Sequence, residues 1–119
     1  MSDVAALEAI LKEIERISGV SDAMLVARTG QHIAGNAPKG SHPDTFAAMG
    51  AMLQGAAEAE GTEMQDRVED VVVHLERNTI VVVNDFPKAL LVLTAAKNAD
   101  PGALRAKVAG FLRRIEENL

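Results

Sequence analysis

The residues of this sequence best suited to chemistry are three histidines and a group of acidic side chains. Histidine binds metals and transfers protons near neutral pH, but His32, His42 and His74 lie in separate segments without the spacing of a metal site. Each histidine is therefore predicted to be a solvated or strand-face side chain. The acidic group surrounds a predicted strand and is more typical of a solvated edge than of a cation site; it comprises Asp66, Glu69, Asp70 and Glu76.

Other signatures of catalysis or cofactor binding are missing from the sequence. The absence of cysteine excludes a thiolate nucleophile, a redox motif and a Cys-ligated zinc. Gly30 and Gly35 belong to a predicted hairpin and to neither GxxxxGK[ST] nor GxGxxG, so they do not predict a phosphate loop. No GxSxG elbow or nucleophile with an adjacent base occurs. The chain is not expected to be an enzyme or to hold a cofactor or metal.

Composition and charge narrow the class of protein further. The 119 residues are expected to form one domain, 1–119, large enough to bury a core without staples. The formal charge of −5 would repel a phosphate backbone, and no basic stripe offsets it, so nucleic acid is not expected as a partner. No apolar run reaches the length of a membrane span, and no export signal is evident, so we expect a cytoplasmic protein without membrane insertion.

The segment 68–96 is predicted to be the sheet that the rest of the chain covers. Three short apolar runs, bounded by turn-forming residues, indicate strands at 71–75, 79–83 and 89–94 in an antiparallel meander. The second and third runs are apolar at both parities: Ile80 and Val82 would point to one face, and Val81 and Val83 to the other. A sheet that is apolar on both faces requires helices on both faces.

Helices and a hairpin are predicted around this meander. Apolar periodicity indicates a helix over 3–18 that Gly19 ends, followed by a hairpin of strands 20–28 and 31–35 with a Thr29-Gly30 turn. Ser41 or His42 would cap a second helix, which runs to about Glu60 and is ended by Gly61. A last helix would follow the Asp100-Pro101 cap and continue to the C-terminal region.

The second helix has two apolar stripes, although one is enough to cover a sheet. The stripe expected to cover the sheet consists of Phe46, Met49, Leu53 and Ala57. The spare stripe has small residues that would let another backbone approach, although alanine can also be present for helix propensity alone. A third strand with an unpaired edge would add to such an interface. The predicted dimer and partner interface therefore consists of Ala48, Ala51, Met52, Gly55, Glu58, Ala59, Val71 and Val73.

These segments resemble the roadblock, or dynein light chain roadblock-type, domain. The resemblance rests on Ile17-Ser18-Gly19-Val20, on Asp22 to Val26 with the Thr29-Gly30 turn, and on Asp44 opening an alanine-rich helix. It implies an α+β sandwich with a five-stranded antiparallel sheet, one helix on one face and two on the other. It also implies a homodimer in which third strands pair and second helices lie side by side.

The resemblance further implies a non-enzymatic platform for a Ras-like small GTPase, and two alternatives remain open. A structural scaffold subunit of a dynein- or motility-type complex would share the dimer and differ only in its partner. A small-molecule sensor would need a cavity with inward polar groups, and the predicted strands offer only Thr94 and His74 as polar exceptions. That pattern favours a binding module.

Overall fold

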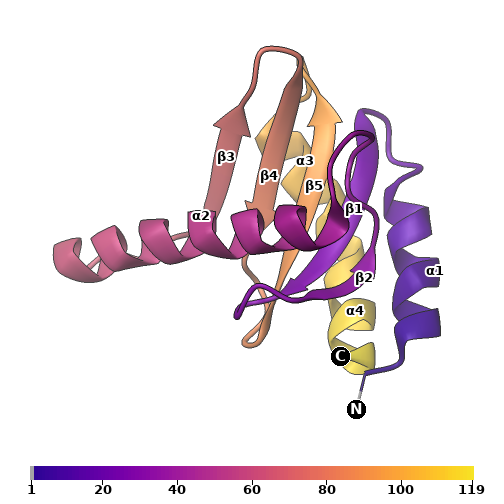
Figure 1. Cartoon of the computed structure of the whole chain (residues 1–119), viewed down its shortest axis with the longest axis horizontal. Helices are drawn as coiled ribbons and strands as arrows, with labels where there is room; N and C mark the ends of the chain where they lie inside the picture. Colours follow the sequence, from indigo (N-terminus) through magenta and orange to yellow (C-terminus); the bar gives the residue numbers. More distant parts are fainter. Residues whose placement is uncertain (1) are drawn as a thin grey trace.

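A five-stranded antiparallel sheet lies between helices on both of its faces (Figure 1). The computed structural model describes residues 2–119. Its elements follow the predicted order and are α1 (Val4–Ile14), β1 (Val20–Ala27), β2 (His32–Gly35), α2 (Pro43–Met64), β3 (Asp70–His74), β4 (Asn78–Val83), β5 (Ala89–Ala96), α3 (Pro101–Val108), a 3-10 helix (Ala109–Phe111) and α4 (Leu112–Asn118).

The strands are arranged in the order β2-β1-β5-β4-β3. The predicted meander is confirmed, because β4 pairs with β3 on one side and with β5 on the other, antiparallel in both cases. The hairpin joins the meander through β1, which pairs with β5 and places Leu25 opposite Leu91. This order leaves β2 and β3 as the two edges of the sheet.

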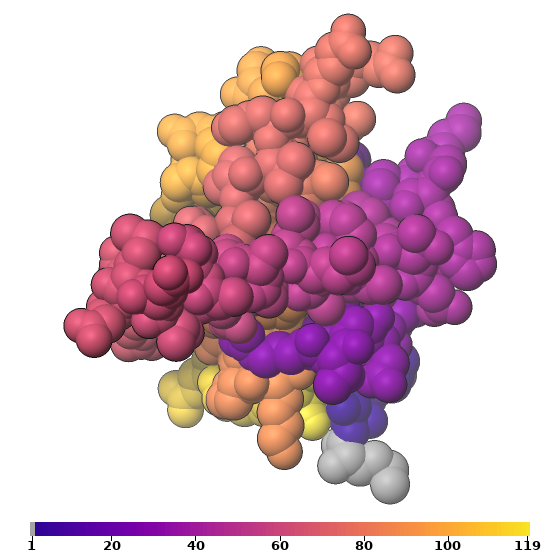
Figure 2. Space-filling view, turned by 60° about the vertical axis from the view of Figure 1, so that its left-hand side comes forward, coloured from indigo at the N-terminus to yellow at the C-terminus, as the bar shows by residue number. Residues whose placement is uncertain are grey.

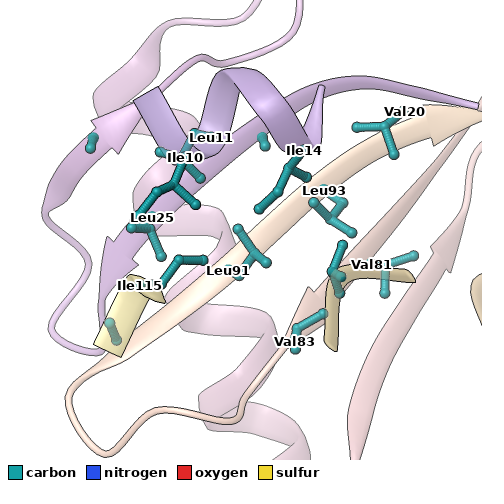
Figure 3. Packing of buried hydrophobic residues seen from close by; sticks show 14 of the residues in the cluster. Ile10, Leu11, Ile14, Val20, Leu25, Val81, Val83, Leu91, Leu93 and Ile115 are labelled. Atoms are coloured by element: carbon teal, nitrogen blue, oxygen red, sulfur yellow. The ribbon is translucent and has the colours of Figure 1, made fainter. Parts of the chain in front are cut away.

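The parity of the apolar strand residues divides the core into two clusters. Val81, Val83, Leu91 and Leu93 face the cluster that α1, α3 and α4 cover (Figure 3). Their neighbours of the other parity, among them Ile80, Val82, Leu90 and Val92, face α2. The split predicted from alternating residues is therefore confirmed, with one helix on one face and the N- and C-terminal helices on the other (Figure 1).

Two helix boundaries differ from the prediction because the chain forms 3-10-type turns there. In these turns an amide donates to the carbonyl three residues earlier. The first helix ends at Ile14 and not at Ser18, since the amide of Ile17 donates to the carbonyl of Ile14 at 3.0 Å. Gly19 does adopt a left-handed φ of 94°, but in the turn before β1. The last helix is divided by the 3-10 turn that contains Gly110, a residue of low helix propensity.

The second helix is longer than predicted and ends at Met64, with Gln65 in the left-handed conformation. Gly61 does not end it. A Cβ at position 61 would lie 2.7 Å from the carbonyl oxygen of Asp66, whose amide donates back to the Gly61 carbonyl at 2.8 Å. Gly61 therefore lies within the last turn of the helix. Its lack of a side chain makes room for the residues that fold back after the helix ends.

Asp22, near the start of β1, gives a prediction about the pH dependence of stability. Burial raises the pKa of its carboxyl, and the nearby Glu15 carboxylate adds to the shift. An acid with a raised folded-state pKa destabilises the fold once pH rises above both its unfolded and folded pKa values. Asp22→Asn is therefore expected to increase the free energy of unfolding at pH 7, and to increase it less at pH 3, in urea titrations. Glu76→Gln, on the exposed β3–β4 turn, is the control, and an equal gain at both pH values would contradict the account.

Candidate protein-binding surface

The face of α2 that points away from the sheet is an exposed apolar stripe. Ala48, Met52, Gly55 and Ala59 recur at intervals of four, three and four residues, so they line one side of the helix. All four are exposed, and 73% of the Met52 surface is accessible. Figure 2 shows α2 as an uncovered ridge across this side of the molecule. The spare stripe predicted from the sequence is therefore solvent-accessible in the protomer.

Ala51 differs from the rest of the predicted stripe because it lies on the flank of α2. It is half-buried beside the Thr29-Gly30 turn, where a Cβ on Gly30 would lie 3.8 Å from the Ala51 Cβ and 3.6 Å from the Ala48 Cα. The turn therefore approaches the helix closely at this point. Ala51 contributes to packing within the protomer more than the other small residues of the stripe do.

The sheet-facing side of α2 packs the helix onto the sheet. Phe46, Ala47 and Gly50 are buried against it, and Met49 and Leu53 are partly buried in the same cluster. A Cβ on Gly50 would lie only 3.0 Å from Val92 Cγ2, so the glycine lets the helix sit close to β5.

The C-terminal half of α2 extends past β3, the edge of the sheet (Figure 1). No residue of this helix after Gln54 is buried. Met64 follows Leu53 and Ala57 at helical spacing, so it lies on the sheet-facing side, yet 65% of its surface is exposed. This half of the helix therefore has an apolar underside with no sheet beneath it.

The edge strand β3 lies beside that overhang. Val71 and Val73 are half-buried and pack against the cluster under α2, while Val72 packs on the opposite cluster. The outer edge of β3 has no strand partner among residues 2–119. An unpaired edge offers backbone donors and acceptors to another strand.

Glu58 is not a free acidic residue of the predicted interface. Its carboxylate is half-buried and accepts hydrogen bonds from Arg28 Nη1 at 3.0 Å and from Gln54 Nε2 at 2.9 Å. The sequence analysis did not predict this cluster of Arg28, Gln54 and Glu58. The only indication of it in the sequence was a glutamine on the sheet-facing side of the helix. Glu60 and Glu63, near the end of the same helix, are exposed and are candidates for steering a basic partner.

The acidic group around β3 is divided by the structure. Asp66 and Glu69 line an open depression of about 650 Å³ with Arg67, Asp85 and Arg105. Glu76 follows the other end of β3, so it does not join them. Within residues 2–119, no three His, Cys, Asp or Glu side chains gather where they could hold a metal ion. None of the helices over the same range combines the length and apolar character needed to cross a bilayer.

Comparison with known proteins identifies the relatives of this chain. A family model described as Roadblock/LC7 domain matches residues 6–95. The solved structure of a gliding protein, mglB, from Thermus thermophilus is similar, with 27% identity, a TM-score of 0.80 and coverage of 98% of this chain and 92% of that one. A structure described as MglB with tetrameric arrangement has 29% identity, a TM-score of 0.78 and coverage of 95% and 88%.

A Roadblock/LC7 domain from Streptomyces avermitilis shares the fold, with 18% identity, a TM-score of 0.82 and coverage of 92% and 94%. The curated proteins contain no match to the chain.

Proposed function

The chain belongs to the Roadblock/LC7 family, and on that premise we propose that it is a non-enzymatic homodimeric adaptor that binds a Ras-like small GTPase. The observation that carries the proposal is the uncovered stripe of α2 beside the unpaired edge of β3. The identity of the partner rests on the family resemblance. Because Ras-like GTPases use cytoplasmic GTP, the proposal also places the chain in the cytoplasm.

The overhang of α2 supports a second copy of this chain as the first partner. If two β3 edges pair about a two-fold axis, the sheet continues beneath the projecting half of each helix. Met64 would then lie over the partner's sheet instead of over solvent, and the two second helices would lie side by side with Gly55 of each near the two-fold axis. Such an interface is self-complementary, and a stable one buries roughly 1,600 Å² in total.

A composite surface across the two subunits would suit a protein ligand. The small residues at its centre keep it flat, and Met52 has the flexible side chain that adapts to different partners. Glu60 and Glu63 add negative charge near the ends of the helices, where they would attract a partner rich in lysine or arginine.

A structural scaffold subunit of a dynein- or motility-type complex is the second candidate function. It requires the same dimer and differs only in what the dimer binds. The likeness to a gliding protein supports a motility-type assembly over a dynein-type one within this alternative. A sensor has less support, because the polar side chains buried among residues 2–119 are limited to Gln54, Thr79 and Thr94.

Calorimetric titration with Ras-like GTPases of the same organism tests the partner. We expect binding with two copies of this chain per GTPase, in either the GDP or the GTP state. In stopped-flow measurements, Glu60→Lys with Glu63→Lys should slow association several-fold at low salt, and the difference should shrink as salt is added.

Glu116→Lys with Glu117→Lys makes the same charge change on α4, at exposed positions on the other face of the sheet, and should leave the association rate unchanged. If no Ras-like GTPase binds in either nucleotide state at tens of micromolar, the partner is wrong and the scaffold function remains.

A further inference from the structure

Arg28, directly after β1, connects α2 to the loop between β4 and β5. Its Nη1 donates to Glu58 Oε2 at 3.0 Å. Its Nη2 donates to Asn84 Oδ1 at 2.7 Å and to the Phe86 carbonyl at 2.9 Å. Its Nε donates to the same carbonyl at 3.2 Å. The planar guanidinium is therefore held on the loop while one nitrogen remains directed at the helix.

The Glu58 carboxylate is fixed from the helix side as well. Gln54 lies one turn earlier, is only 1% exposed, and donates from Nε2 to Glu58 Oε2 at 2.9 Å. Its own Oε1 has no hydrogen-bond partner among residues 2–119. A buried amide that leaves one atom unsatisfied is unfavourable for stability alone. Its one bond serves to hold Glu58 in the orientation that meets Arg28.

The location of this cluster on α2 gives it a specific role. Within residues 2–119, the Glu58 carboxylate makes the only side-chain hydrogen bond that joins α2 to another element. The bond lies where the buried part of the helix ends and the overhang begins, since Gln54 is the last buried residue. Apolar packing therefore contributes little to the direction of residues 59–64. That direction depends on this contact and on the returning chain, where the Asp66 amide donates to the Gly61 carbonyl at 2.8 Å.

We propose that Arg28 is a positioning residue for self-association: by holding Glu58, it sets the direction of the projecting half of α2 that meets a second copy of the chain. The inference rests on the homodimer proposed above and deepens it. Arg28 itself follows β1 and is bonded to the loop between β4 and β5, so it belongs to the sheet layer and not to the exposed stripe of α2. Its removal should change the dimer through the geometry of the helix and not through a lost contact between subunits.

The contact between Arg28 and Glu58 can be tested in a monomer. In a Gly55→Glu background, adding Arg28→Met should accelerate amide hydrogen exchange of residues 59–64 by at least about tenfold, while the amide of Val82 in β4 keeps its rate. Arg114→Met is the matched control, because Arg114 pairs with Glu13 at 2.6 Å on the other face of the sheet. If the exchange rates of residues 59–64 stay within twofold of those in the Gly55→Glu variant alone, the proposal is overturned.

The effect on the dimer dissociation constant is measured by sedimentation equilibrium in chains that keep Gly55. Arg28→Met is expected to raise the dimer dissociation constant at least tenfold. Arg28→Lys, which keeps the charge but lacks the planar fork, should raise it less, and Arg114→Met should leave it within twofold. The lysine variant also keeps the test usable if the methionine variant does not fold.

The two proposals fail in different ways. A dimeric wild type with an unchanged dissociation constant in both Arg28 variants overturns the positioning role and leaves the dimer standing. A monomeric wild type overturns both.

Discussion

Replacing Gly55 with Glu is expected to separate the proposed dimer into folded monomers. The two-fold axis would bring two introduced carboxylates together in apolar surroundings, and a desolvated like-charge contact costs several kcal/mol. About 3 kcal/mol corresponds to a rise of roughly 100-fold in the dissociation constant. The protomer should remain folded, because a Cβ at position 55 meets no atom within 4 Å and a glutamate forms helix better than glycine.

Gly110→Glu is the matched control for this experiment. Its added Cβ also meets nothing within 4 Å, and Gly110 lies in the 3-10 turn on the other face of the sheet. Sedimentation velocity should find a monomer for the Gly55 variant and a dimer for the Gly110 variant, with circular dichroism of the wild type in both. Retention of the dimer by the Gly55 variant would mean that this stripe is not the interface.

Leu91→Ala is expected to destabilise the protomer by about 2–5 kcal/mol. Leu91 is in the middle of β5, is fully buried, and faces α1 and α4 (Figure 3). Truncation would remove apolar contacts and leave a cavity that the surrounding strands cannot close completely. Urea unfolding at one fixed protein concentration measures the loss, because the stability of a dimer depends on concentration.

Leu75→Ala removes the same atoms from a side chain that is 45% exposed in the β3–β4 turn. Its cost should be well under that of Leu91→Ala. Equal losses from the two variants would contradict the layered arrangement of the core.

The features that the sequence predicted well are those determined by neighbouring residues. Alternation in 80–83 and 90–93 was enough to infer two apolar faces, because side chains on a strand must point to opposite sides. The spare stripe was evident for the same reason, since helical spacing places Met52 and Gly55 on one side.

The features that the sequence did not predict depend on distant parts of the chain. Gly61 was interpreted as the end of a helix. Its contact with the returning chain at Asp66 depends on the three-dimensional fold and is not evident from the sequence. Arg28 and Glu58 are 30 residues apart, and Arg28 and Asn84 are 56 apart, so no local pattern connects them. Glu58 was therefore predicted to be available to a partner, although it is paired within the protomer.

The molar mass of the wild-type chain in solution tests the homodimer, on which the platform and the role of Arg28 both depend. Light scattering at tens of micromolar should give about twice the 12.6 kDa of one chain. A mass of one chain at that concentration would contradict the account, because the apolar stripe of α2 and the edge of β3 would then remain exposed to solvent.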